Sequence, residues 1–210
     1  MSDKQSLPTG LQLILDGRRD DPAAARRKGI DFARRALEVA DDEAGTLTNA
    51  AFALAYFGED IGARIAVVDR ALALNPSFAR GWHISGVLRM WAGQLDLGVK
   101  HVEASLRLSP RSRVADWAFV TGYARFAARC FDDAVAKLLL AIQQDPSFPH
   151  PYRVLAACYA HMGRLDDAHD TIEQLSAIGP VMPDDARYLR NPEHRELFLS
   201  GLRLAMDEAE

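Results

Sequence analysis

The stretch that decides the fold lies in the second half of the chain, where residues 149–180 read PHPYRVLAACYAHMGRLDDAHDTIEQLSAIGP. Apolar and small residues recur in it at steps of three and four, the spacing of one face of an α-helix. They are Tyr152, Leu155, Ala156 and Tyr159 before Gly163, and Ala168, Ile172 and Leu175 after it. Glycine readily adopts the left-handed backbone that ends a helix, and Pro180 cannot continue one. The stretch therefore predicts two antiparallel helices joined by a tight turn at Gly163.

The same arrangement recurs along the chain. Prolines close four helix-like segments at intervals of 34, 36 and 34 residues, at Pro76, Pro110, Pro146 and Pro180. A turn residue precedes each proline by 17 or 18 residues, at Gly58, Gly93, Arg129 and Gly163. Four periods that agree independently predict four helical hairpins.

The period and the placement of small residues are typical of the tetratricopeptide repeat (TPR). We therefore predict an all-α fold of TPR-type helix-turn-helix repeats stacked in a right-handed superhelix. The predicted repeats span residues 44–78, 79–112, 113–148 and 149–180. The second repeat departs from the pattern at Ser85 and Arg89, where larger apolar residues are usual.

The ends of such a stack need cover, because each hairpin buries too little surface alone. Residues 22–43 are expected to form half a repeat, and residues 1–21 an N-terminal segment, partly disordered or the remnant of a helix at 11–15. Residues 181–210 are expected to form a capping helix and tail. Asn191 suits the N-cap of that helix, Pro192 its first turn, and Glu193 the positive end of its dipole.

Composition narrows the function classes. The 210 residues are 49% apolar and 26% charged, with 25 Lys and Arg against 29 Asp and Glu. This balance disfavours nucleic acid as a partner. No apolar run reaches the roughly 18–20 residues that span a bilayer, and the start lacks a signal-peptide pattern. We expect a cytoplasmic chain with no membrane partner and, since it has two cysteines, no disulfide framework.

Several segments resemble the C-terminal TPR region of bacterial class III adenylate cyclases. Among them are ALAYFGEDIGARIAVVDRALALNPSFARGWHISG and the ending LRNPEHRELFLSGLRLA. The similarity covers roughly residues 18–206, and the same region also resembles TPR regulators that carry a winged-helix domain. The resemblance implies a regulatory or docking arm, because in that family a separate domain carries the cyclase activity. This chain has no segment that matches that domain, so we expect no enzyme activity and no cofactor. The segment FGEDIG at 57–62 is only faintly similar to the metal-binding loop of that catalytic domain. Glu59 and Asp60 suit the start of a helix.

Two alternatives to a binding module remain open. The first is a small metal-dependent enzyme that uses the side chains of the fourth repeat, His150, Cys158, His161 and His169. No motif with metal-ligand spacing supports it, so we expect no metal site. Catalysis by Cys130 or Cys158 lacks an evident activating base. The second alternative is a homo-oligomer that packs through its uncovered first repeat.

A partner would bind the concave surface, which the first helix of each TPR pair lines. Positions 2, 5, 9 and 12 of the repeats give the predicted groove: Arg80, His83, Val87, Met90, Phe119, Tyr123, Phe126, His150 and Arg153. Its apolar and aromatic centre with basic edges would suit a protein or peptide segment with an apolar anchor and an acidic end.

Overall fold

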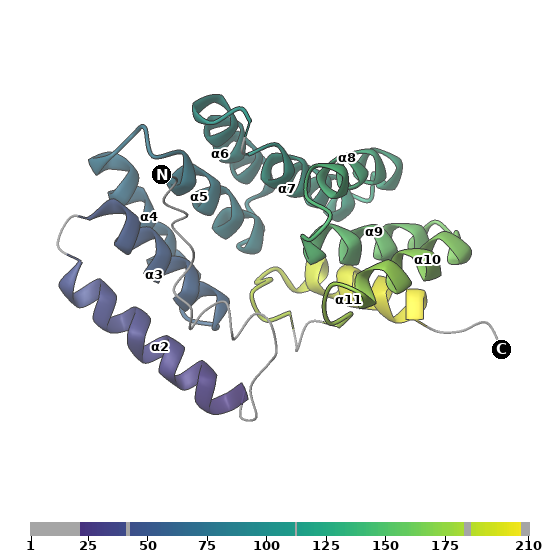
Figure 1. Cartoon of the computed structure of the whole chain (residues 1–210), viewed down its shortest axis with the longest axis horizontal. Helices are drawn as coiled ribbons and strands as arrows, with labels where there is room; N and C mark the ends of the chain where they lie inside the picture. Colours follow the sequence, from purple (N-terminus) through teal and green to yellow (C-terminus); the bar gives the residue numbers. More distant parts are fainter. Residues whose placement is uncertain (1–21, 41–42, 112, 183–185, 207–210) are drawn as a thin grey trace.

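The structure, a computed structural model, describes residues 22–40, 43–111, 113–182 and 186–206. Every regular element within these ranges is an α-helix (Figure 1). The helices are α2 (Pro22–Val39), α3 (Ala44–Tyr56), α4 (Ile61–Leu74), α5 (Ala79–Trp91), α6 (Leu95–Leu108), α7 (Val114–Ala127), α8 (Phe131–Gln144), α9 (Pro149–His161), α10 (Leu165–Ser176) and α11 (Pro192–Met206). The prediction of an all-α TPR-type fold is confirmed.

The helices α3 to α10 form four antiparallel hairpins that stack in chain order (Figure 1). Each pair, such as α5 with α6, packs together, and its second helix packs on the first helix of the next pair. The first helices, α3, α5, α7 and α9, line the inner face, and α4, α6, α8 and α10 lie outside them. One hydrophobic core runs through the stack, because each hairpin shares its apolar side chains with both neighbours.

The four hairpin turns share one backbone geometry. Gly58, Gly93, Arg129 and Gly163 all have positive φ, at 101°, 83°, 60° and 74°. In each turn the next residue donates its N–H to a carbonyl five residues back, as Arg164 does to Tyr159 at 2.9 Å. This bond satisfies a carbonyl that the ending helix leaves without a partner. Arg129 therefore holds a left-handed conformation that glycine holds in the other three turns.

Small residues let the helices of a pair approach closely. A Cβ on Gly86 of α5 would lie 2.9 Å from the Gly98 carbonyl oxygen of α6 and 2.5 Å from Val102 Cγ1. In the fourth hairpin Ala156 and Ala168 are completely buried at the corresponding contact. The small residues of the repeat pattern thus mark the helix crossings.

The second repeat replaces two apolar residues by the buried Ser85 and Arg89, which take part in a polar network. The Arg89 guanidinium donates to both Asp69 carboxylate oxygens at 2.9 Å, and it also contacts Ser85 Oγ. His101 Nδ1 lies 3.0 Å from the same hydroxyl. The charge of Arg89 is thereby paired at the contact between α4 and α5, which permits a buried arginine where the pattern expects an apolar residue.

Helix α2 packs on α3, the inner helix of the first hairpin. Its Ala33 packs with Leu54 and Phe57 in a separate apolar cluster, and Arg34 pairs with Glu59 at 2.6 Å. The N-terminal segment 1–21, with the helix remnant at 11–15, lies outside the described residues.

The C-terminal helix α11 packs mainly on α9, the inner helix of the last repeat, and less on α10. A Cβ on Gly201 would lie 2.9 Å from Ala157 Cα, so the two helices touch closely there. Asn191 Oδ1 accepts from the N–H groups of Glu193 and His194 at 2.9 and 3.1 Å, which is the N-cap that the sequence predicts. Helix α11 thus covers the last repeat from the inner side of the stack.

Residues 186–191, which we name the strap, lead into α11 and reach the first two hairpins. The yellow-green segment before α11 lies beside the ends of α3 and α5 (Figure 1). Its Arg190 donates to the Ala55 carbonyl, 135 residues earlier in the chain, at 2.9 Å. The strap therefore joins the two ends of the stack across the inner face.

Candidate functional site

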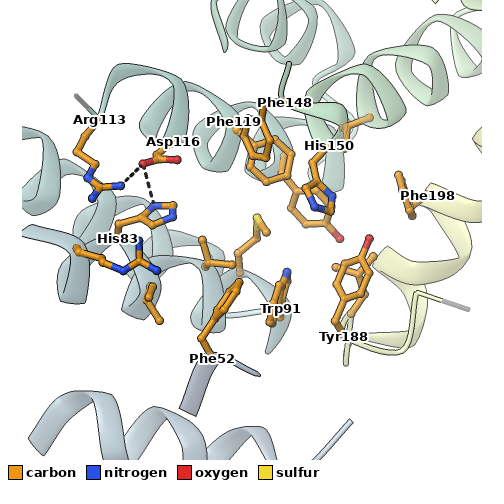
Figure 2. Close-up of a pocket in the computed structure, with 17 residues that line it drawn as sticks. Phe52, His83, Trp91, Arg113, Asp116, Phe119, Phe148, His150, Tyr188 and Phe198 are labelled. Atoms are coloured by element: carbon orange, nitrogen blue, oxygen red, sulfur yellow. Dashed lines mark hydrogen bonds and ion pairs between the residues drawn. The ribbon is translucent and has the colours of Figure 1, made fainter. Parts of the chain in front are cut away.

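The inner face encloses a cavity of about 290 Å³ between the inner helices, the strap and α11. Seven of the nine predicted groove residues line it: Arg80, His83, Val87, Met90, Phe119, Tyr123 and His150. They come from α5, α7 and α9, whose inner faces meet at this place because the three hairpins stack in order. Figure 2 shows the labelled lining side chains facing this space from both sides. We call this space the inner cavity.

The other two predicted residues lie elsewhere. Phe126 is completely buried, with its ring 5.9 Å from that of Phe131 in α8. It is therefore a core residue between the helices of its own hairpin. Arg153 is not among the residues that line the inner cavity, and its Nε donates to the Pro180 and Val181 carbonyls at 3.2 and 3.1 Å. These carbonyls follow α10, so Arg153 fastens the end of the last repeat.

Sequence reasoning missed other residues of the cavity wall, which are Phe52, Ile84, Trp91, Arg113, Asp116, Phe148, Val154, Tyr188, Leu189 and Phe198. Trp91 and Phe148 lie at the end of one inner helix and just before the start of another, outside the positions that the repeat rule selects. Tyr188 and Leu189 belong to the strap, and no periodic signal in the sequence indicates where that segment goes. Phe52 in the first repeat and Asp116, which is position 2 of the third, could have been found by applying the repeat rule in full.

One end of the inner cavity is polar and basic. Arg113 donates to Asp116 at 2.8 Å, and His83 Nδ1 lies 3.7 Å from the same carboxylate (Figure 2). Arg80 donates through Nε and one terminal nitrogen to Asn49 Oδ1 at 3.2 and 3.0 Å. Burial lowers the pKa of His83, although the Asp116 carboxylate opposes this, so the imidazole stays neutral near pH 7. Two guanidinium groups against one carboxylate make this end positive.

The other end of the inner cavity is aromatic. The Trp91 ring lies 5.1 Å from Phe52 and 5.2 Å from Tyr188, centroid to centroid. On the facing wall the Phe119 and Phe148 rings meet edge to face at 5.2 Å. Offset and edge contacts of this kind are the favoured geometries of aromatic pairs. This end therefore offers a rigid apolar surface.

Two polar groups in the aromatic wall are held neutral. Burial, with a smaller contribution from Arg153, lowers the pKa of His150 to about 3. Burial raises the pKa of Tyr123, so its phenol keeps the proton. The Tyr123 side chain is 2% exposed, and its hydroxyl has no hydrogen-bond partner among the described residues. A bound group could supply that partner, because an unsatisfied buried hydroxyl costs free energy.

The side chains of the metal-enzyme alternative do not form a common site. His161 Nε2 donates to the Leu197 carbonyl at 2.8 Å, and its ring stacks on Phe131 at 5.5 Å. Cys158 is completely buried, and burial raises the pKa of its thiol to about 12, while Cys130 is exposed at a turn. Across the described ranges no three His, Cys, Asp or Glu side chains are placed to hold a metal ion.

The loop that echoes a metal-binding segment has structural contacts of its own. Asp60 Oδ1 accepts from the Ala63 N–H at 2.6 Å and caps α4. Glu59 pairs with Arg34 of α2. Asp60 thus has the predicted role at a helix start, whereas Glu59 connects the first hairpin to α2.

Comparisons with known proteins agree with the helix-turn-helix architecture. The sequence model of the tetratricopeptide repeat family matches residues 125–190. A search of the curated protein sequences finds no match. No helix of the described residues is long and apolar enough to cross a membrane.

Solved structures resemble most of the stack. A thermophilic TPR protein of Thermus thermophilus is 21% identical, with 94% of this chain and 97% of that chain covered and a TM-score of 0.65. A crystal structure of MamA is 15% identical, with 82% of this chain and 95% of that chain covered and a TM-score of 0.53. A double mutant of MamA from RS-1 is 18% identical over 82% of this chain and 96% of that chain, with a TM-score of 0.52. At these identities the likeness concerns the fold, which is that of a TPR stack.

Proposed function

We propose that the chain is a non-catalytic TPR interaction module that binds a segment of a protein partner in its inner cavity. The observation that carries the proposal is the convergence of Arg80, His83, Phe119 and His150, from three successive inner helices, on one partly enclosed space. Rigid aromatic anchors beside a few placed polar groups are the composition of binding hot spots.

The size of the inner cavity favours a peptide side chain or two over a large cofactor. Its volume of about 290 Å³ lies at the lower end of the range for small-molecule pockets. The aromatic wall suits an apolar side chain, and the positive end suits a carboxylate, which guanidinium groups bind well. We therefore expect a partner segment with an apolar anchor and an acidic residue or terminus.

The resemblance to adenylate cyclases adds a finer proposal. If the chain corresponds to the C-terminal arm of such a protein, the bound segment regulates or docks a cyclase rather than serving as a substrate. The two free cysteines, Cys130 and Cys158, suit a reducing compartment, so we place this activity in the cytoplasm.

The experiment that tests the binding proposal is selection of peptides from a random display library on the full chain. Selected peptides should carry an apolar residue near a carboxylate and bind with micromolar Kd. Val87→Trp, which fills the inner cavity, and Arg80→Glu, which reverses its charge, should each weaken binding at least tenfold. Lys100→Glu, an exposed change on α6, is the matched control and should leave Kd unchanged. Peptides that bind all four proteins equally would refute the groove as the binding surface.

Self-association has one observation in its favour. Helix α2 at the start of the described stack exposes Phe32 and Val39, at 64% and 76%. Exposed apolar side chains on a terminal helix suit contact with a second copy. Sedimentation that shows only monomer across micromolar concentrations would exclude this alternative at those concentrations.

A further inference from the structure

The end of the inner face formed by α3 and α5 is occupied by the chain itself. The Tyr188 ring of the strap stacks on Tyr56 at 5.8 Å and an interplanar angle of 12°, and it lies 5.2 Å from Trp91. Leu189, beside it, is 2% exposed. Figure 2 shows Tyr188 entering the space opposite His150. An aromatic and an aliphatic side chain of a short segment without regular structure thus fill one end of the groove.

The third anchor of the strap is an arginine at the end of a helix. The Arg190 guanidinium donates to the Ala55 and Glu59 carbonyls at 2.9 and 3.0 Å, and its backbone N–H donates to the Trp91 carbonyl at 2.7 Å. Ala55 and Trp91 lie in the last turns of α3 and α5, where the helix dipole is negative, and Glu59 lies in the turn that follows α3. A cation with several donors is the group that suits such a place.

The bound strap also carries structural costs. Ala186, at its start, has φ of 49°, a left-handed conformation that is unfavourable for residues with a Cβ. Arg190 Nε and Tyr123 Oη are buried without a hydrogen-bond partner among the described residues. Strained backbone of this kind is concentrated at ligand clamps and switch segments. These costs would be relieved if the strap left the groove.

We propose that the strap is an intramolecular occupant of the groove, displaced by a partner segment of the same chemistry, an aromatic residue and an aliphatic residue followed by arginine. This inference rests on the proposed function and concerns the aromatic end of the groove, which a partner can occupy only if the strap leaves it. The acidic group proposed above would meet the basic end, at Arg80 and Arg113. The strap is held by aromatic contacts and by hydrogen bonds to helix-end carbonyls, all of which a peptide in trans can reproduce.

Because the strap is covalently attached to the rest of the chain, it occupies the groove in preference to a free peptide of the same sequence. A short covalent connection corresponds to an effective concentration in the millimolar range. A partner segment therefore binds the closed protein weakly, and its affinity rises when the strap is weakened.

The test uses the capped, fluorescein-labelled hexapeptide ARYLRN, the sequence of residues 186–191, and the full chain. Fluorescence anisotropy should give a Kd at least tenfold lower for the double variant Tyr188→Ala/Arg190→Ala than for the wild type. The peptide ARALAN, which lacks the tyrosine and arginine anchors, should lose at least tenfold in affinity. Arg203→Ala, an exposed change on α11, is the matched control and should behave as wild type.

Hydrogen exchange of the wild type provides a second measurement. The amide of Arg190, which donates to Trp91, should exchange at least tenfold faster than buried amides in the middle of α11, because the strap opens without the helix. If the double variant does not fold by circular dichroism, Arg190→Ala alone replaces it. Failure of both to fold would show that the strap is part of the core and would overturn the proposal.

Further results of these measurements would support or refute displacement of the strap. Equal Kd values for wild type and variant, or strap amides that exchange only with α11, would refute displacement. A wild-type dimer that the hexapeptide dissociates would identify a second copy as the occupant, and would equally refute it. If the hexapeptide fails while display-selected peptides still bind, the strap proposal falls and the binding function stands. If the hexapeptide binds and no display peptide does, the strap proposal stands, and the apolar-plus-acidic partner segment expected above is refuted.

Discussion

At the scale of single residues, Arg129 shows how the repeat pattern tolerates an exception. Its φ of 60° matches the glycines of the other turns, and its side chain is exposed. The hydrogen bond from Cys130 to the Arg125 carbonyl at 2.9 Å closes the turn in the same way. The sequence could therefore be interpreted correctly despite the missing glycine, because the hairpin geometry is imposed by the helices on either side.

Arg129→Gly should stabilise the protein. Glycine adopts the left-handed conformation without a Cβ clash, and we expect a gain of about 0.5–1 kcal/mol in the free energy of unfolding. Urea denaturation measures it. Gly163→Ala is the matched control, since a Cβ there meets nothing within 4 Å, so its expected loss of about 1 kcal/mol reflects the backbone alone. A destabilised Arg129→Gly would contradict this account of the turn.

At the scale of helices, the sequence predicted which small residues lie at helix crossings, but not what they meet. Gly86 faces backbone, the Gly98 carbonyl and Val102, whereas Gly122 faces only the Leu138 and Lys137 side chains. Nor could the pattern predict the partner of Arg89, because Asp69 lies on a neighbouring hairpin. Repeat positions indicate that two helices touch, and only the packing shows which atoms are in contact.

Gly86→Ala and Gly122→Ala should therefore differ, although both are helix positions where alanine has the higher propensity. The Gly86 change forces α5 and α6 apart and should cost about 1–3 kcal/mol. The Gly122 change displaces the flexible end of Leu138, so its cost should be smaller by at least about 1 kcal/mol. Thermal and urea unfolding of both variants measure the difference. Equal losses would show that the α5 and α6 backbones can separate freely.

At the scale of the whole molecule, the strap adds a long-range contact to a stack that otherwise depends on contacts between neighbouring repeats. Repeat proteins are close to one-dimensional, since each repeat contacts only its neighbours. Here Arg190 joins the end of the chain to Ala55 and Glu59 of the first hairpin. Tyr188 and Leu189 of the strap also form part of the wall of the inner cavity, where side chains from four inner helices are partly withdrawn from water.

The burial of His150 in this cavity predicts that the free energy of unfolding falls in acid. The pKa of His150 falls from 6.5 to about 3 on folding, because of burial and then the nearby Arg153 charge. The unfolded chain therefore binds more protons between these values, and stability decreases as pH falls through that window. We expect His150 to account for about 1–2 kcal/mol between pH 6.5 and 4.5.

Urea unfolding of wild type and His150→Gln over that pH range measures this contribution. Carboxylates titrate in both proteins, so the difference between the two slopes isolates the imidazole. The wild type should lose more stability in acid than the variant. Parallel slopes would mean that folding leaves the pKa of His150 unchanged.

The sequence by itself determined the helical hairpins, their turns and the cap of α11, because helix starts, helix ends and apolar periodicity are encoded within a few residues of one another. It also indicated part of the cavity wall, since seven of the seventeen lining residues were predicted from the inner faces of successive first helices. Only the tertiary structure decided that Phe126 and Arg153 serve packing and that Tyr188 and Arg190 fill the groove. The strap joins residues more than a hundred positions apart, and no local pattern specifies such a contact. Its placement depends on where the assembled stack leaves apolar surface and helix-end carbonyls to be covered.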